Sequence, residues 1–333
     1  MKKITLKMWT ILLSLCVFAS VNAADKVFPL GQSDINLISD GGKVAYDGAT
    51  KTIIYTGAGE IWQFAGYQWS AGNYEDLSAY EYVVVEFDAS DLPDLTDPPK
   101  IQVQVTYADD TNTQVEVRKQ WGNAGVKLDT EKSVAIKEIF VKSQYEGKIV
   151  LGTIYATTPK NSDVPFYTLN GRDNGEYNGV TKTLSVSGNW GRISWENINK
   201  DVTGYTSLVC EFEIASFEGA NWVQLIGEED GQADIINEVD DMSDGKAQID
   251  ITGMTTLKSL HLKLNEAGGS VVLKRIYLEP EDDPTGIAEL TNQEDAAVAG
   301  YYTIMGVKLP DAPVNGLYIV KYANGKAVKV IKK

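Results

Sequence analysis

The sequence predicts an all-β protein with two tandem antiparallel β-sandwich domains of jelly-roll type and a small C-terminal β unit. Three observations predict this fold class. Short runs of alternating or β-branched residues recur along the chain, turn dipeptides such as Asn-Gly and Asp-Gly separate them, and several motifs occur twice in the same order. No stretch has the spacing of a convincing amphipathic helix. Many short strands with frequent turns are typical of sandwiches and jelly rolls.

The N-terminal segment has the features of a secretory signal peptide. Lys2, Lys3 and Lys7 form a positive stretch, an apolar run covers residues 9–19, and residues 21–23 precede the expected cleavage site. The apolar run is too short to cross a bilayer as a helix. We therefore expect a protein that is secreted or displayed on the outer cell surface, with no insertion into the membrane.

Composition excludes several classes of function. The chain carries 30 basic and 46 acidic residues, for a net charge of -16, and loss of the signal peptide makes it more negative. Such a surface repels nucleic acid and anionic lipid, so neutral polymers or cations are the natural partners. Because His261 is the only histidine and Cys210 the only cysteine beyond the signal peptide, a zinc cluster of these residues is excluded. We expect a half-exposed His261 and a buried Cys210, each on a strand.

The body of the chain is a duplication. The spacing between matching motifs shrinks along the chain, which indicates small loop deletions in the second copy. The matching pairs are residues 46–52 with 177–183, 76–80 with 201–205, 86–90 with 211–216, and 154–155 with 276–277. The expected division is a signal peptide at 1–23, a first repeat at 24–160, a second repeat at 161–284 and a tail at 285–333.

Each repeat contains segments with the pattern of strands. In the first repeat, residues 82–87, 101–106 and 115–117 alternate or are rich in β-branched residues. Residues 208–212 and 271–273 do the same in the second repeat. Glycine-containing turn dipeptides lie between these segments, as antiparallel strands require.

The tail follows an acidic, proline-containing linker at residues 279–284. Residues 302–306, 316–320 and 324–333 indicate a small three-stranded unit with a basic end. The order Tyr-x-x-x-Gly, Gly-x-Tyr-Ile and Gly-Lys with terminal lysines resembles the C-terminal sorting domains of the Bacteroidetes type IX secretion system. The resemblance implies recognition by secretion machinery, passage through the outer membrane, and display or release there.

Aromatic and polar residues in and beside the expected strands are candidates for sugar binding. Sugar rings place C–H faces on aromatic rings, and their hydroxyl groups pair with amide, carboxylate and guanidinium groups. Alternation places Gln102 and Gln104 on one strand face and pairs Trp222 with Gln224 on another. Burial in a sandwich core is the alternative for each tryptophan. The expected carbohydrate-binding residues are Trp62, Tyr67, Trp69, Gln102, Gln104, Arg118, Trp121, Trp190, Arg192, Trp195, Trp222, Gln224, Glu86 and Glu211.

Carboxylates raise two further hypotheses. Glu86 and Glu211 occupy the same repeat position, and Asp88 and Glu213 follow two residues later, so each pair lies about 6.5–7 Å apart on one strand face. Because inverting glycosidases place their carboxylates about 6.5–9.5 Å apart, catalysis is an alternative to sugar contact or simple solvation. Acid-rich loops carry the oxygen ligands that calcium prefers, but without an EF-hand spacing, and solubilising loops are the preferred interpretation.

The two repeats resemble carbohydrate-binding modules of the galactose-binding-like superfamily. The resemblance rests on the duplicated sandwich, the Asp-Leu-Ser-x-Tyr entry at residues 76–80, and closing strands of the Val-x-Leu-x-x-Ile-Tyr type at residues 271–277. It implies non-catalytic binding of a polysaccharide such as β-glucan or a related neutral plant glycan. It also implies a structural calcium ion as an open alternative, without assigned ligands; no other cofactor is expected, and we expect a monomer. A glycoside hydrolase or polysaccharide lyase on a jelly-roll fold, and a structural or adhesive surface protein, are the alternative functions.

The two repeats are expected to bind glycans unequally, because the first carries Tyr67 and Trp69 in an extended stretch that the second lacks. Expression of residues 24–160 and 161–284 as separate proteins, each titrated calorimetrically with the best ligand, should give different affinities or different preferred glycans. Equal affinity and stoichiometry in the two pieces would show that the divergence is neutral.

Overall fold

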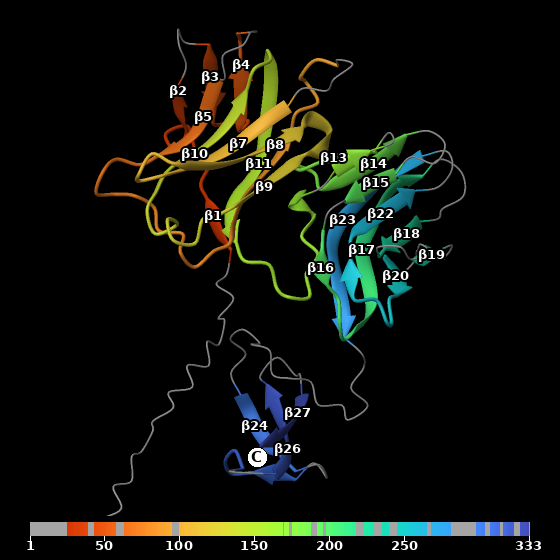
Figure 1. Ribbon diagram of the computed structural model, residues 1–333. Coiled ribbons are helices and arrows are strands. Elements are labelled where there is room, and N and C mark those ends of the chain that lie inside the picture. The colour runs from red at the N-terminus through yellow and green to blue at the C-terminus, as the bar shows by residue number, and fades with distance from the viewer. Residues whose placement is uncertain are drawn as a thin grey trace, which may run out of the picture.

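A computed structural model of the chain shows two β-sandwiches side by side and a smaller C-terminal sheet (Figure 1). The signal peptide expected at 1–23 lies outside the described residues. The structure describes residues 25–38, 43–57, 63–94, 100–168, 170–172, 175–187, 192–195, 198–217, 223–229, 235–239, 245–264, 268–280, 298–303, 307–313, 316–322 and 327–332.

The first sandwich consists of two antiparallel sheets, which we name the β6 sheet and the β7 sheet. The β6 sheet contains, in spatial order, β3 (Val44–Asp47), β4 (Thr52–Tyr55), β11 (Gly147–Thr157), β6 (Tyr82–Asp88) and β9 (Asn123–Lys127), with β1 (Lys26–Phe28) also paired to β11. The β7 sheet contains β2 (Asn36–Ile38), β5 (Gln63–Gln68), β10 (Ile136–Ser143), β7 (Lys100–Tyr107) and β8 (Asn112–Arg118). A 3-10 turn, η1 (Lys119–Trp121), links β8 to β9.

The second sandwich also consists of two antiparallel sheets, the β17 sheet and the β18 sheet. The β17 sheet contains β13 (Gly175–Asn178), β14 (Thr183–Ser187), β23 (Gly268–Pro280), β17 (Tyr205–Phe217) and β20 (Lys246–Asp250). The β18 sheet contains β12 (Asn170–Arg172), β15 (Arg192–Trp195), β22 (Ser259–Leu264), β18 (Val223–Glu228) and β19 (Ile235–Val239). The short strands β16 (Lys200–Asp201) and β21 (Thr256–Leu257) pair with each other, and the 3-10 turn η2 (Phe166–Thr168) precedes β12.

The two sandwiches have the same strand order, which extends the duplication seen in the sequence to backbone pairing. The amide of Phe87 donates to the carbonyl of Gly122 at 2.8 Å, and in the second copy Phe212 donates to Gly245 at 2.9 Å. Both glycines have positive φ, 61° and 68° respectively, a conformation that residues with a Cβ rarely adopt. Each repeat of the motif is therefore a structural unit with its own pair of sheets.

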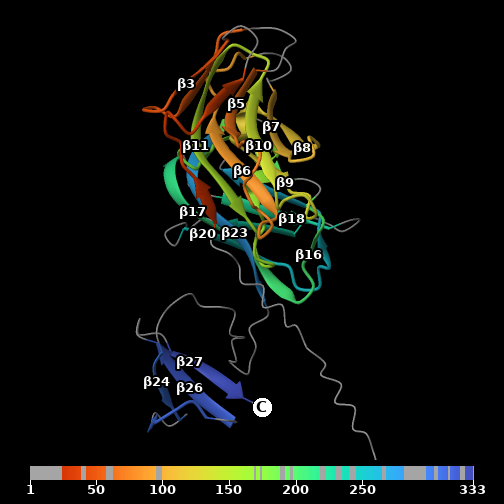
Figure 2. The ribbon, with the colours of Figure 1, turned by 90° about the vertical axis from the view of Figure 1, so that its left-hand side faces the viewer.

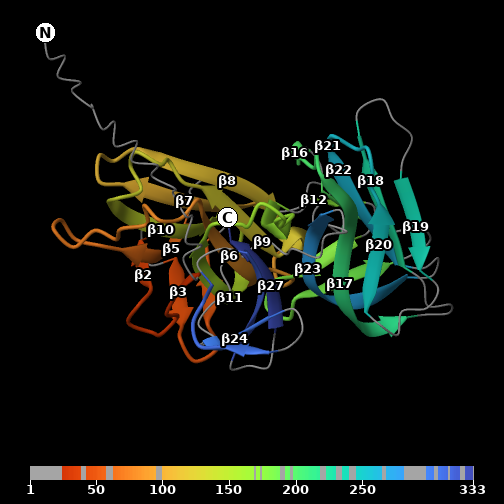
Figure 3. The same ribbon diagram turned by 90° about the horizontal axis from the view of Figure 1, so that it is seen from below.

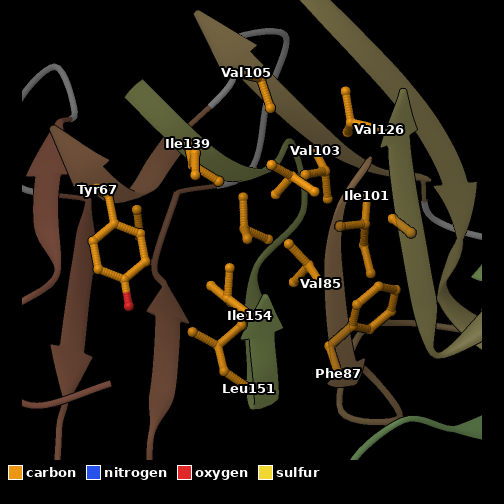
Figure 4. Close-up of a cluster of buried hydrophobic side chains, with 14 of the residues drawn as sticks. Tyr67, Val85, Phe87, Ile101, Val103, Val105, Val126, Ile139, Leu151 and Ile154 are labelled. Carbon is orange, nitrogen blue, oxygen red and sulfur yellow. The ribbon is translucent and has the colours of Figure 1, made fainter. Parts of the chain in front are cut away.

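Alternation fills the space between the sheets of each sandwich. In the first sandwich, Val85 and Phe87 of β6 face Ile101 and Val103 of β7, and all four are fully buried (Figure 4). Burial of apolar surface contributes about 25 cal/mol for each Å² removed from water, and this is the main stabilising contribution of such a core. The core of the second sandwich is separate and includes the fully buried Trp195.

The structure confirms the predicted fold class. The five predicted strand segments all fall within β6, β7, β8, β17 and β23. The described part of the chain has no helix other than the 3-10 turns η1 and η2. Cys210 lies buried in β17 as expected, and burial raises the pKa of its thiol to about 12. It is therefore an unreactive core residue at neutral pH.

The C-terminal unit is a four-stranded sheet, so the prediction of three strands is wrong by one. Its spatial order is β25 (Lys308–Leu309), β24 (Val298–Tyr302), β26 (Gly316–Tyr322) and β27 (Ala327–Lys332). Figure 2 shows β24, β26 and β27 of this sheet. The extra strand arises because the amide of Thr303 donates to the carbonyl of Val307 at 2.8 Å, which turns the chain back beside β24. A two-residue strand carries no recognisable alternation in the sequence.

Truncation of Trp195 to alanine is expected to lower the free energy of unfolding by about 3–5 kcal/mol, because it empties a fully buried site. Trp69→Ala is the matched control, since Trp69 is only half-buried at the edge of the first core. Urea titration followed by fluorescence compares the two. An equal loss from both variants would contradict the burial described here.

Candidate functional site

The outward face of the β7 sheet carries the two glutamines singled out in the sequence. Gln102 and Gln104 alternate along β7 with Val103, which is buried between the sheets. Because successive side chains of a strand point to opposite sides, both glutamines face away from the core. Arg118, exposed at the end of β8, lies on the same face.

A lysine occupies the centre of this face. Lys142 of β10 lies between Phe64 of β5 and Gln102 of β7 in the antiparallel register. Its ammonium lies 4.5 Å from the centroid of the Phe64 ring and donates to Oε1 of Gln104. Burial lowers the pKa of Lys142. Gln102 in turn donates from Nε2 to Oε1 of Glu116 on β8 at 3.3 Å. We name the order Lys142, Gln102 and Glu116 across these three strands the Lys–Gln–Glu row.

The second sandwich repeats the Lys–Gln–Glu row in the same register. Lys263 of β22 pairs with Gln224 of β18, and Gln224 pairs with Glu238 of β19. Arg192 of β15 takes the place that phenylalanine holds at the other end of the first row. The side chains of Lys263, Gln224 and Arg192 are all partly exposed. Lysine and glutamine therefore occupy equivalent outward positions on both sandwiches, and Glu238 holds the register position that Glu116 holds in the first.

Phenylalanine supplies the aromatic surface of the β7 sheet. The rings of Phe64 and Phe140 meet edge to face, with centroids 5.9 Å apart. Phe64 remains half-buried, whereas only 2 % of Phe140 is exposed. Sequence reasoning centred on tryptophan missed this pair. The available signal was the alternation of Glu138, Phe140 and Lys142 with apolar residues along β10.

His261 forms a buried polar cluster on the equivalent face of the second sandwich. Its Nδ1 lies 2.7 Å from the hydroxyl of Ser194, and its Nε2 lies 3.0 Å from Oε1 of Glu228. Only 3 % of His261 is exposed, so the expectation of a half-exposed histidine is wrong: the ring faces outward on its strand, but Ser194 and Glu228 lie beside it. Ser194 is fully buried, so its hydroxyl does not present itself to a substrate despite the Ser-His-Glu order.

The structure places several predicted binding aromatics in the cores. Tyr67 points inward, donates its hydroxyl to the carbonyl of Pro29, and stacks on Trp69 with ring centroids 5.5 Å apart. Trp195 is fully buried, and Trp121 packs against the first core. Tyr67 and Trp195 are therefore corrected to core residues, because inward alternation leaves neither ring a face for a sugar.

The repeated glutamates lie on the opposite sheets from the Lys–Gln–Glu rows. Glu86 of the β6 sheet is 3 % exposed and paired with Lys182, so a sugar-binding role is corrected to a structural one. Glu211 of the β17 sheet accepts a 2.8 Å hydrogen bond from the hydroxyl of Tyr277, which lowers the pKa of Glu211. A glycosidase acid needs the opposite, a raised pKa, so this carboxylate is unsuited to that role.

Trp62, Trp190 and Trp222 lie outside the described residues, as do parts of the acid-rich loops. Among the residues that the structure describes, no three His, Cys, Asp or Glu side chains group together as metal ligands would. The same ranges contain no helix with the length and apolar character to cross a membrane.

No protein-family model matches this sequence, and no curated protein sequence matches it. Among solved structures, the chain is similar to the family 11 carbohydrate-binding module of the cellulase Lic26A-Cel5E of Clostridium thermocellum, at 12% identity and TM-score 0.24 over 41% of this chain and 84% of that one. It is similar to the CBM22-1-CBM22-2 tandem domain of Paenibacillus barcinonensis Xyn10C, at 13% identity and TM-score 0.26 over 78% and 97%. An allantoicase matches at 11% identity and TM-score 0.29 over 77% and 93%. TM-scores of this size do not establish a common fold. The strand pairing within this chain defines its two sandwiches.

The hydroxyl of Ser259 donates to Glu228 and is the largest cause of the lowered pKa of that carboxyl, ahead of His261. A lowered folded-state pKa contributes stability that is present above the ordinary value of 4.5 and is lost as the pH falls through the folded value. Ser259→Ala is therefore expected to unfold at lower urea than wild type at about pH 7, with the difference shrinking toward about pH 3. Ser187→Ala, at an exposed strand position, is the control. A difference that grows in acid would contradict this assignment.

Proposed function

We propose that this chain is a non-catalytic polysaccharide-binding protein that is secreted or displayed on the cell surface, with a neutral plant glycan such as β-glucan as its ligand. The observation that carries the proposal is the Lys–Gln–Glu row on the outward face of the β7 sheet, whose register positions are held by the same residue types, Lys263, Gln224 and Glu238, in the second sandwich. Core packing does not require these polar residue types on an outward face. Their recurrence at equivalent positions therefore favours a shared function over packing.

The chemistry of the face suits a sugar. In the first sandwich, the exposed residues Arg118 and Gln114 and the partly exposed Gln104 offer donors and acceptors for hydroxyl groups. Phe64 provides an aromatic ring beside them, on which a sugar C–H face can pack. Lys100 and Glu116 form an ion pair on this face, and charges paired within the protein suit a neutral polymer better than a charged one.

Two copies of the row on one chain favour a polymeric ligand. A second binding event on the same polymer becomes intramolecular, and effective concentrations reach the millimolar range for short connections. Two individually weak faces can therefore retain a polysaccharide firmly. The rows differ at one end, where Phe64 in the first sandwich corresponds to Arg192 in the second, and this difference supports unequal sites.

Export and sorting belong to the same proposal. The residues expected to form the signal peptide would direct the chain across the inner membrane. The C-terminal sheet, with its resemblance to sorting domains of the Bacteroidetes type IX system, would engage secretion machinery.

Deletion of residues 285–333 should leave glycan binding intact and stop delivery to the surface, as read by cell fractionation and immunoblotting. Unchanged surface delivery would remove the sorting role.

Glu116→Ala and Gln224→Ala each remove an accessible member of one row. We expect each to weaken retention in affinity gels containing the best polysaccharide by about fivefold to tenfold, and the double variant to lose more than either. Lys148→Ala, at an exposed position on the β6 sheet, is the matched control and should behave as wild type.

Two results would contradict the proposal. Folded wild-type protein that is not retained on any polysaccharide of a broad panel would remove polysaccharide binding. Retention of wild type together with unaffected retention of the double variant would place binding elsewhere than on the rows.

A further inference from the structure

Part of the outward face of the β6 sheet, at β6 and β9, contacts the second sandwich. The two sandwiches meet where β6, β9 and η1 of the first contact β13 and η2. Figure 3 shows the second sandwich beside the end of the first that carries β6 and β9. The amide of Gly179 donates to the carbonyl of Phe87 at 2.9 Å, and Nδ2 of Asn178 donates to Oδ2 of Asp88 at 2.8 Å. The side chain of Asn123 donates to the carbonyl of Phe166 at 3.2 Å. Backbone and side-chain bonds therefore both cross the junction.

An ion pair lies at the centre of this junction. Lys182 of the second sandwich pairs with Glu86 of the first, and the Glu86 side chain is 4 % exposed. A buried carboxylate is costly unless a cation stands beside it. Because Glu86 takes its cation from the other sandwich, the first sandwich alone would leave this charge without the partner it has here.

Two glycines allow the close approach that the junction needs. A Cβ added to Gly122 would collide with the carbonyl oxygen of Tyr177, and one added to Gly179 would collide with the carbonyl oxygen of Gly122. Both positions therefore accept only glycine while the two backbones remain in contact. This closeness indicates packing of interior quality rather than two domains joined by a tether.

The equivalent face of the second sandwich satisfies its own glutamate. The ammonium of Lys246 lies 3.5 Å from the carboxylate of Glu211. Lys246 and Asn123 occupy equivalent positions: each follows the positive-φ glycine of its repeat, and each lies opposite the repeated glutamate in the strand register. The hydroxyl of Tyr277 also donates to Glu211. A cation within the second sandwich thus takes the place that Lys182 fills from outside in the first.

The equivalent turn of the first sandwich is also closed within its own repeat. The amide of Gly48 donates to Oε1 of Gln32 at 2.6 Å, whereas its counterpart Gly179 donates across the junction to Phe87. Lys51 has positive φ like Lys182, 54° against 60°, so the two turns share a backbone conformation. The contacts across the junction are therefore specific to one turn and one face.

We infer that this surface, centred on Glu86 and Lys182, is a docking interface that couples the two sandwiches into one cooperative unfolding unit. The inference is independent of the proposed function, because its test needs no glycan. It predicts that the matched residues Lys51 and Glu211, at equivalent repeat positions, are dispensable for coupling.

The test is urea unfolding of residues 24–333, read by hydrogen exchange and mass spectrometry of peptides from each sandwich. Wild type and Lys51→Met should show coincident unfolding of the two sandwiches. Lys182→Met should separate the two midpoints and lower the protection of β6 and β9 peptides on the order of tenfold. Glu86→Gln should act in the same direction, while Glu211→Gln leaves coincidence intact.

Two outcomes would overturn the inference. Wild-type sandwiches that already unfold at separate midpoints would show that no coupling exists. Lys182→Met with unfolding as coincident as that of Lys51→Met would show that the ion pair does not carry it. If Lys182→Met fails to fold, Asn178→Ala removes a different contact of the same interface, and Asp47→Ala is its matched control. Unchanged coincidence in Asn178→Ala would then count equally against the inference.

Discussion

The two-residue period of the β-strand is the constraint on which the rest of this structure depends. Each strand gives one set of side chains to a core and the other to an outward face. Val103 and Gln102 point to opposite faces of the sheet for that reason alone, although they are neighbours in sequence. The outward faces then differ in what covers them. In the first sandwich, one outward face carries the Lys–Gln–Glu row, and part of the other, at β6 and β9, contacts the second sandwich.

Duplication followed by divergence explains how one framework supports different faces. Equivalent positions hold Glu86 and Glu211, yet the first takes its cation from the neighbouring sandwich and the second from its own Lys246. The exchange of Asn123 for lysine at the equivalent position makes this difference. The source of the cation therefore distinguishes Glu86, whose ion pair links the two sandwiches, from Glu211, whose ion pair lies within the second sandwich.

The aromatic residues show how far sequence patterns carry an argument about a site. Alternation identified the outward glutamines because it depends only on local backbone geometry. It did not separate Tyr67 and Trp195, which pack in cores, from Phe64, which faces outward. The reason is that aromatic side chains are suited both to a sandwich core and to an outward binding surface. His261 similarly lies on the outward side of its strand, as predicted, but the groups that bury it come from β15 and β18, far away in the sequence.

The all-β class, the duplication, the acidic character and the faces of the central strands could be predicted from the amino-acid sequence, since each follows from local periodicity, composition or self-similarity. The three-dimensional structure was needed to identify the partners of Glu86 and His261, the part of each outward face that is covered, and the alignment of the Lys–Gln–Glu row across three strands. These properties depend on strand register and on contacts between residues distant in the chain. A single sequence does not specify such pairings, because many registers satisfy the same local alternation.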